Sequence, residues 1–238
     1  MSQKAYAILG RAYDSLISDY PYQKMEEKLS GFLSGKGFDV GAGSGMLTVC
    51  LAKSGLSVVA VEPSEEMLAV AKEKAKREKV NPVFVKSKAE DVEFTPCNFV
   101  IATCDVLNYL PSKKAFEIFV KKVHRSLKSE GKFVFDIRRM DILKSMNGQV
   151  YYDDRESITY LWTNSVIGDK LNMSLTFFEK DESGKYERAD EEHKFLMLSD
   201  EYVIEILDSA GFSVKAYGDG LGKRKSSDNR IFFFCTKK

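Results

Sequence analysis

The 238-residue sequence predicts an α/β protein with a doubly wound, mostly parallel seven-stranded sheet and an inserted antiparallel meander. Three observations lead to this prediction. Strand-like apolar runs alternate with helical segments from residue 36 to about 138, as in parallel sheets covered by helices. A glycine-rich turn joins the first apolar run to the first helical segment. After residue 148, apolar and polar residues alternate with period two, which is typical of antiparallel strands with one wet face.

The first half of the chain supplies five of the expected strands and three helices. The helical segment after the second strand begins at Ser64, a good capping residue, and carries Glu65 and Glu66 in its first turn, where the helix dipole favours acids. The last of the three helices has its apolar residues along one face. We expect strands at 35–40, 57–62, 82–87, 98–104 and 131–137, and helices at 46–55, 64–79 and 112–128.

The second half of the chain combines the meander with the end of the main sheet. We expect meander strands at 149–166, 169–181 and 185–198, then a helix at 199–211 and closing strands at 212–218 and 230–237. The boundaries predict an N-terminal helical lid (1–34), a main domain (35–148 and 197–238) and an inserted antiparallel sheet (149–196).

Composition and charge limit the function classes. Hydrophobic residues make up 44% of the chain and charged residues 30%, the balance of a soluble globular protein. Lys plus Arg (36) nearly equals Asp plus Glu (35), so we expect neither a nucleic acid nor a membrane as partner. The chain starts without a secretory pattern and has no apolar run near the ~20 residues that span a bilayer, so we expect a cytoplasmic location. Four scattered cysteines and two distant histidines predict no metal site.

The glycine-rich turn predicts a nucleoside site. Gly41, Gly43 and Gly45 follow the first strand, and Asp39 stands two residues before them. A dinucleotide fingerprint would place its third glycine where Met46 stands, and Asp39 would repel a pyrophosphate. A carboxylate at this position suits the cationic end of a ligand, or it could cap the amides of the turn, and both roles could coexist.

This turn resembles the first motif of the class I S-adenosylmethionine-dependent methyltransferases, an acidic residue followed by G-x-G-x-G. The resemblance extends over residues 36–138 and implies a Rossmann-like sheet of order 3-2-1-4-5-7-6 whose last strand is antiparallel. It also implies S-adenosyl-L-methionine as cofactor and S-adenosyl-L-homocysteine as product. Ser129 and Glu130 stand where the family more often has Pro and Gly before the fifth strand, a departure that affects a turn and not the site.

The resemblance assigns cofactor contacts beyond the turn. Glu62, at the end of the second strand, stands where the family binds both ribose hydroxyls, although such an acid could also cap the next helix. Asp91 stands where an acid contacts the adenine amino group, although it could be an ordinary loop residue. The segment around Tyr13 and Tyr20 resembles a lid over the cofactor, although both tyrosines could pack as core. The remaining expected contacts are Ala42, Pro63, Met67, Ala89, Glu90, Cys104 and Asp105.

The sequence identifies the methyl acceptor only by class. The fourth strand does not end in the D/N-P-P-Y/F pattern of enzymes that methylate planar amino groups, so we expect an N or O atom of a small molecule. Methyl transfer needs few catalytic groups, and the candidates are His193, Tyr109 and Tyr13, each of which could instead be a packing or surface residue. Lys223, Arg224 and Lys225 could hold an anionic group or lie in solvent.

Other activities and assemblies stay open at this point. A cofactor-binding regulator or partner subunit without turnover is one alternative, and an NAD(P)-dependent oxidoreductase is another. The aromatic strands of the inserted sheet suit a pocket roof or a dimer seam, so we expect a monomer or a homodimer formed through that sheet.

Overall fold

The computed structural model describes residues 20–155, 158–181 and 183–238. Tyr13 and most of the predicted lid (1–34) therefore lie outside the described residues; within that range, α2 (Tyr22–Ser30) is helical. Among the described helices, none has both the length and the apolar character needed to cross a membrane.

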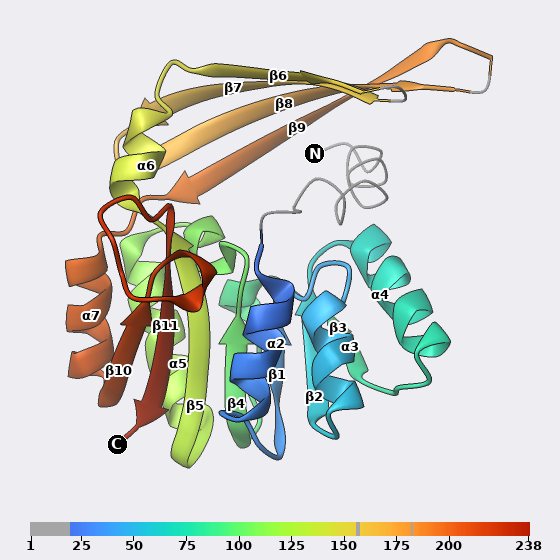
Figure 1. Ribbon diagram of the computed structural model, residues 1–238. Helices are drawn as coiled ribbons and strands as arrows, with labels where there is room; N and C mark the ends of the chain where they lie inside the picture. Colours follow the sequence, from blue (N-terminus) through green and yellow to red (C-terminus); the bar gives the residue numbers. More distant parts are fainter. Residues whose placement is uncertain (1–19, 156–157, 182) are drawn as a thin grey trace.

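A seven-stranded sheet forms the centre of the molecule, in the order β10-β11-β5-β4-β1-β2-β3 (Figure 1). β11 runs antiparallel to both of its neighbours, whereas the other six strands all run in one direction. The predicted strand order and the antiparallel last strand are thus confirmed. The strands are β1 (Lys36–Val40), β2 (Ser57–Glu62), β3 (Val83–Lys86), β4 (Cys97–Ala102), β5 (Leu127–Arg138), β10 (Phe212–Tyr217) and β11 (Arg230–Lys237).

Helices cover both faces of this sheet because its central strands are apolar on both sides. One buried cluster joins the sheet to α5 (Lys113–Ser126) and α7 (Asp200–Ser209), and another joins it to α2 and α3 (Met46–Lys53). α4 (Glu65–Arg77) contacts β2 and the edge strand β3. Ser64, Ser112 and Ser199 each accept a hydrogen bond from a backbone amide at the start of α4, α5 and α7, so their caps fix where these helices begin.

The inserted segment forms a separate four-stranded antiparallel sheet, here called the roof sheet, in the order β6-β7-β8-β9. Its strands are β6 (Val150–Asp154), β7 (Ile158–Ile167), β8 (Lys170–Lys180) and β9 (Tyr186–Leu196). The prediction of one strand over 149–166 was wrong, because β6 and β7 pair as a hairpin. Asp153 and Asp154 are the last residues of β6, and the polar DDRES sequence that begins with them interrupts the apolar alternation. α6 (Met140–Ser145), which connects β5 to the roof sheet, was not predicted.

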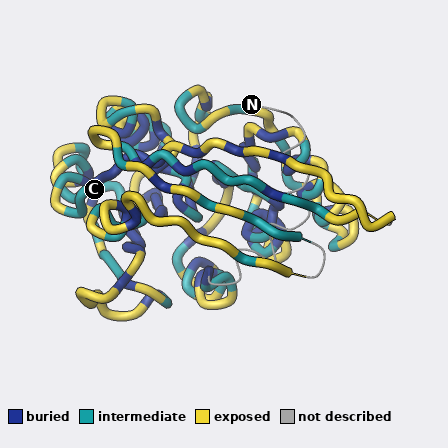
Figure 2. Tube along the Cα trace, turned by 90° about the horizontal axis from the view of Figure 1, so that it is seen from above, coloured by how far each residue is buried: buried dark blue, intermediate teal, exposed yellow. Residues whose placement is uncertain are grey.

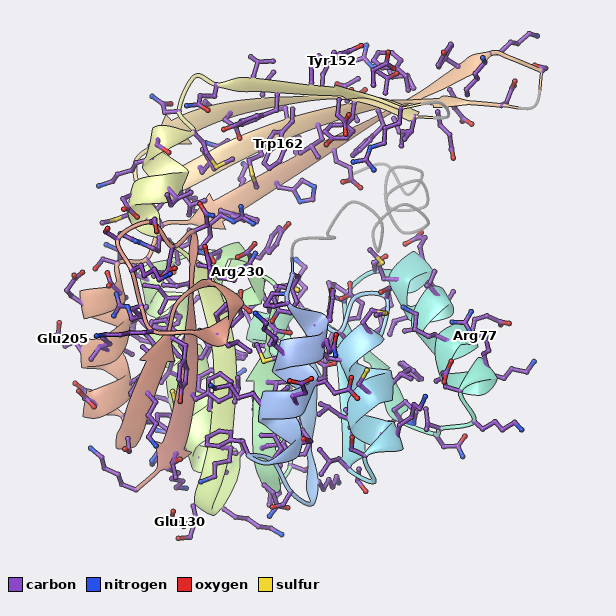
Figure 3. The ribbon with its side chains drawn as sticks, viewed as in Figure 1. Arg77, Glu130, Tyr152, Trp162, Glu205 and Arg230 are labelled. Carbon is purple, nitrogen blue, oxygen red and sulfur yellow. The ribbon has the colours of Figure 1, made fainter. Side chains whose placement is uncertain are left out.

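The roof sheet lies over the edge of the main sheet at which the parallel strands end (Figure 1). Seen from above, its strands cross the molecule and are largely exposed or half-buried, while the main sheet beneath is buried (Figure 2). Period-two alternation gives the roof sheet two faces. Tyr152 projects away from the main sheet, whereas Trp162 projects toward it (Figure 3). The inward face is therefore the one that can close a site at the strand ends.

Asn108 ties the roof sheet to the main sheet. This fully buried side chain belongs to η2, a 3-10 turn (Val106–Tyr109) that follows β4. Its Nδ2 donates to the carbonyl of Leu196 in β9 at 2.9 Å, and its Oδ1 accepts from the amide of Arg138 in β5 at 3.0 Å. One amide side chain thus satisfies a backbone group from each of the two sheets.

Replacing Asn108 with leucine should lower the free energy of unfolding by about 2–4 kcal/mol. The carbonyl of Leu196 and the amide of Arg138 would each lose the hydrogen bond that Asn108 makes in place of water. Chemical denaturation of the full chain measures this change. Asn81→Leu is the matched control: Asn81 is exposed, so its loss should stay within about 0.5 kcal/mol. Equal stability of the two variants would contradict the anchoring role.

Candidate active site

The turn between β1 and α3 has a backbone that only glycine adopts without strain. Gly41, Gly43 and Gly45 have φ values of 70°, 54° and 78°, in the left-handed region. A Cβ on Gly41 would lie 2.2 Å from Val106 Cγ2, and one on Gly45 would lie 2.8 Å from Ala71 Cβ. The glycines therefore serve two purposes: they allow the turn, and they let η2 and α4 approach it closely.

Glu62 holds the turn from the end of β2. Its Oε2 accepts from the amide of Gly43 at 2.9 Å, and its Oε1 accepts from the amide of Ser64 at 3.0 Å. The carboxylate is buried, and burial raises its pKa despite these two bonds. The sequence analysis considered Glu62 as a cap of the following helix. Glu62 does bind a backbone amide just before α4, and it also binds one in the glycine turn. Each oxygen still has a lone pair for a ligand hydroxyl.

Asp39 is the second buried acid of the turn. Its Oδ2 accepts from the Thr48 hydroxyl at 2.5 Å. Burial raises the pKa of Asp39 to about 6, the Thr48 bond opposes this rise, and the nearby charge of Glu62 adds to it. Within residues 20–155, 158–181 and 183–238, neither Asp39 nor Glu62 forms an ion pair. Two buried carboxylates without a cation fit a ligand that brings positive charge and hydroxyl donors.

A small cavity opens beside these groups, where β1 and β4 end. Its walls are formed by the glycine turn, the first residues of α3 and the segment that follows β4. The lining residues are Tyr22, Asp39, Gly41, Ala42, Gly43, Ser44, Met46, Leu47, Thr103 and Cys104. The Tyr22 hydroxyl lies 3.7 Å from the Cys104 sulfur. Burial, followed by the charge of Asp136, raises the pKa of the Cys104 thiol well above its usual value, so this cysteine stays neutral.

A buried charge cluster, formed by Asp105, Asp136, Arg138 and Arg230, fixes the end of β4 next to this cavity. Asp136, at the end of β5, accepts from the amides of Cys104 at 2.8 Å and Asp105 at 3.0 Å, and both of these residues have positive φ. Arg230, which lies at the top of β11 (Figure 3), bridges Asp136 and Asp105, with 2.7 Å to Asp105 Oδ1. Arg138 also pairs with Asp105, at 3.2 Å.

Two of the predicted cofactor contacts, Tyr20 and Asp105, direct their side chains into this charge cluster. The buried Tyr20 hydroxyl donates to Asp136 at 3.3 Å, so the side chain lies against the cluster and not freely over the site. Asp105 directs its carboxylate to two arginines. Burial is the main cause that raises the pKa of Asp136, and Arg230 acts against it. No sequence spacing indicated this cluster, because Arg230 is 94 residues from Asp136.

The segment predicted to contact adenine follows β3. Ala89, Glu90 and Asp91 form a 3-10 turn, η1, and the amide of Ser87 just before it donates to the carbonyl of Glu62 at 3.3 Å. The segment therefore starts beside Glu62, although none of its three predicted residues lines the cavity. Of the two remaining predicted contacts, Met67 is buried in α4 and Pro63 is exposed.

The structure brings together two of the three catalytic candidates. Tyr109, at the end of η2, places its hydroxyl 3.0 Å from Nδ1 of His193, on the inward face of β9. His193 Nε2 lies 2.9 Å from Glu191 Oε2. Sequence reasoning missed Glu191, although its spacing of two from His193 places both on one face of a strand. Arg224, a candidate for an anionic group, instead pairs with Asp200.

Comparisons with known proteins agree with this geometry. Residues 38–135 match the model of a methyltransferase domain. A protein of Geobacillus sp. (strain WCH70) that is named as a methyltransferase is 30% identical over 240 residues, which cover 95% of this chain and 96% of the relative.

Two solved structures show the same fold. An S-adenosylmethionine-dependent methyltransferase from Clostridium acetobutylicum ATCC 824 superimposes with a TM-score of 0.88 at 23% identity, over 98% of each chain. CalS10, an amino pentose methyltransferase from Micromonospora echinaspora solved with S-adenosylmethionine bound, gives a TM-score of 0.71 at 15% identity, over 91% of this chain and 90% of that one.

Replacing Arg230 with methionine should destabilise the fold by about 3–5 kcal/mol, because Asp105 and Asp136 would lose the charge that compensates their burial. Denaturant unfolding of the full chain checks this. Arg188→Met is the control, since Arg188 pairs with Asp190 on an exposed part of the roof sheet and should contribute less than about 1 kcal/mol. A loss at Arg230 no larger than that at Arg188 would refute the importance of the cluster.

Proposed function

The chain belongs to the class I S-adenosylmethionine-dependent methyltransferases, and from this premise we propose that it methylates an N or O atom of a small molecule held between the glycine turn and the roof sheet. The observation that carries the proposal is the position of the roof sheet. It covers the edge where the parallel strands end (Figure 1), and its buried polar pair, Glu191 and His193, contacts η2 through the hydrogen bond between His193 and Tyr109. A covered site of this kind suits a small acceptor better than a nucleic acid or a protein.

The cofactor contacts are likewise our assignment. Glu62 would accept from the ribose hydroxyls through its free lone pairs, and Asp39 would face the cationic end of the ligand. The backbone of residues 41–44 would lie along the ligand, because these residues line the cavity together with Asp39. The chemistry of the donor set supports this assignment, because buried carboxylates with raised pKa values favour a cation over a pyrophosphate.

The work left to the protein is mainly positioning. When bound, S-adenosylmethionine supplies a methyl group that is already activated by its sulfonium. The acceptor atom must then approach the methyl carbon from the side opposite the sulfur, at about 3 Å and away from water. The glycine turn, the charge cluster that fixes Cys104, and the roof sheet that excludes solvent would together meet this requirement. The likeness to CalS10, an amino pentose methyltransferase, supports a polar, sugar-sized acceptor.

Turnover on a panel of small acceptors tests the function. The full chain is incubated with methyl-labelled S-adenosylmethionine and, separately, glucosamine, tyramine, catechol and benzoate, and products are detected by mass spectrometry. We expect a methylated amine or phenol. Tight cofactor binding with no product on any of these acceptors would instead favour the regulator alternative.

Affinity for S-adenosylmethionine should fall as the pH decreases through about 6. Asp39 has a pKa of about 6 in the free protein, and a bound cation favours its ionised form. Below that pH a proton must leave Asp39 on binding, so Kd should rise by at most about tenfold per pH unit. Calorimetry between pH 5 and 8 measures this dependence. Asp39→Asn should bind more weakly at pH 8 and show a flatter profile; an unchanged profile would exclude Asp39 as the responsible group.

Replacing Glu62 with glutamine should raise the Kd for S-adenosylmethionine about 10- to 100-fold, because charged hydrogen bonds to the ribose would be lost. Calorimetry at pH 8 measures the change, and a thermal melt verifies that the variant is folded. The control is Glu65→Gln, since Glu65 is an exposed acid three residues after Glu62, at the start of α4, and pairs with Lys86. Native affinity in Glu62→Gln would show that the ribose is bound elsewhere.

A further inference from the structure

We propose that Trp162, Asn164 and Glu191, on the inward face of the roof sheet, bind the methyl acceptor, and that this acceptor carries an amine next to a hydroxyl group. The inference rests on the proposed function and adds to it the residues that recognise the acceptor and the chemical class that they select. None of the three was a predicted site residue, because their shared feature, an unpaired polar atom, is visible only in the structure.

Unpaired polar atoms concentrate where the two sheets meet. In residues 20–155, 158–181 and 183–238, five buried side-chain atoms have no hydrogen-bond partner: His124 Nε2, Arg138 Nε, Trp162 Nε1, Asn164 Oδ1 and Glu191 Oε1. Three of them belong to the roof sheet, and Arg138 ends β5, whose amide there is bonded to the residue that ties the sheets together. A buried polar atom without a partner is unfavourable. The roof sheet therefore offers hydrogen bonds that a ligand can complete.

The strand register places the three roof-sheet side chains on one face. Trp162 in β7 lies opposite Leu175 in β8, and Leu175 lies opposite Glu191 in β9. Paired residues of antiparallel strands share a face, and Asn164, two residues from Trp162 in the same strand, shares it as well. Trp162 projects toward the main sheet (Figure 3). All three side chains therefore belong to the inward face.

The spacing of the three groups fits two functional groups of one small molecule. Trp162 and Asn164 are about 7 Å apart along their strand, so one ligand hydroxyl can accept from the indole N–H and donate to the amide oxygen. Glu191 lies two strands away from Trp162, at about 10 Å between backbones. A second polar group next to that hydroxyl can therefore reach Glu191 Oε1 from the same molecule.

Glu191 makes an amine the favoured second group. The side chain is buried, its Oε2 lies 2.9 Å from His193 Nε2, and its Oε1 is the unpaired oxygen. In the described part of the chain, no lysine or arginine forms an ion pair with Glu191. A protonated amine would complete the hydrogen bonding of Oε1 and bring positive charge to a buried carboxylate. A ligand carboxylate or phosphate would be repelled.

Apolar side chains lie between the polar groups. Leu175 separates Trp162 from Glu191, and Met173 occupies the next row of the sheet, opposite Asn164. Met173 belongs to the buried cluster that joins the roof sheet to α6, and Trp162 and Leu175 pack against that cluster. Leu175 is only half-buried, so its surface can pack against the carbon atoms of a ligand. The site thus combines apolar area with three directed polar atoms.

The short turn η2 connects this site to the place assigned to the cofactor. At its start, Val106 fills the space that a Cβ on Gly41 would need, and at its end Tyr109 is hydrogen-bonded to His193 of the roof sheet. Tyr109 is 47% exposed, so this end of the junction is open to solvent and to a ligand. The unpaired atoms themselves are shielded, so we expect the half-buried Trp162 ring to turn when a ligand binds.

Fluorescence tests the site directly, because Trp162 is the only tryptophan in the sequence. The full chain, saturated with S-adenosylhomocysteine, is titrated with trans-2-aminocyclohexanol, cyclohexylamine and cyclohexanol, and N-acetyltryptophanamide corrects for collisional quenching. We expect the amino alcohol to bind most tightly, cyclohexylamine about 3- to 10-fold more weakly, and cyclohexanol at least about 10-fold more weakly. An unchanged emission with the amino alcohol, or equal affinity for all three compounds, would overturn the proposal.

Substitutions assign each polar group to its partner. Glu191→Gln keeps the size of the side chain and removes its charge, so the Kd for the amino alcohol should rise about 10- to 100-fold while that for cyclohexanol stays unchanged. Glu192→Gln is the matched control, since Glu192 is exposed on the opposite face of β9. Trp162→Phe should raise the Kd about 3- to 10-fold in calorimetry, and Tyr152→Phe, on the outward face, should not. Thermal melts verify folding, and equal Kd values for Glu191→Gln and Glu192→Gln would refute the site.

Turnover separates this inference from the proposed function. Amino alcohol binding that responds to these substitutions, without methylation of any acceptor in the panel, would support the site and contradict the proposed function. Methylation of an acceptor with the same kcat/KM in the wild type, Glu191→Gln and Trp162→Phe would refute the site and leave the proposed function intact.

Discussion

The site depends on one carboxylate, that of Asp136, which binds two successive backbone amides at the end of the neighbouring strand. Cys104 and Asp105 both have positive φ, which is unfavourable for side-chain-bearing residues. Their amides point to the Asp136 oxygens at 2.8 and 3.0 Å. Arg230 compensates the buried charge from the last strand. Where this turn lies determines where η2 lies, and η2 contacts both the glycine turn and the roof sheet.

The features that could be predicted from the sequence are those encoded locally. Gly41, Gly43 and Gly45 follow an apolar strand at fixed spacing, and Glu62 ends the next strand, so the amino-acid order alone places both at one sheet edge. The parallel sheet, its order and its antiparallel last strand follow from strand and helix alternation together with the family resemblance. In the first case a short window of residues contains the whole signal, whereas in the second the signal extends over residues 36–138.

The features that were missed depend on residues far apart in the chain. Asp136 and Arg230 are separated by 94 residues, and Tyr109 and His193 by 84, so no local pattern connects them. The hairpin of β6 and β7 was missed for a different reason: alternation continues on both sides of its polar turn, so the segment resembles one long strand. The predicted role of Tyr13 concerns a residue outside the described part of the chain.

The neutral thiol of Cys104 has a chemical consequence for a protein that handles an alkylating agent. The sulfur lines the cavity in which we place the methyl donor, and thiolates are among the strongest nucleophiles in proteins. Burial and the adjacent Asp136 charge keep this sulfur protonated. With the methyl donor in this cavity, a protonated thiol beside the sulfonium would be a weak nucleophile, which would protect the protein from methylating itself.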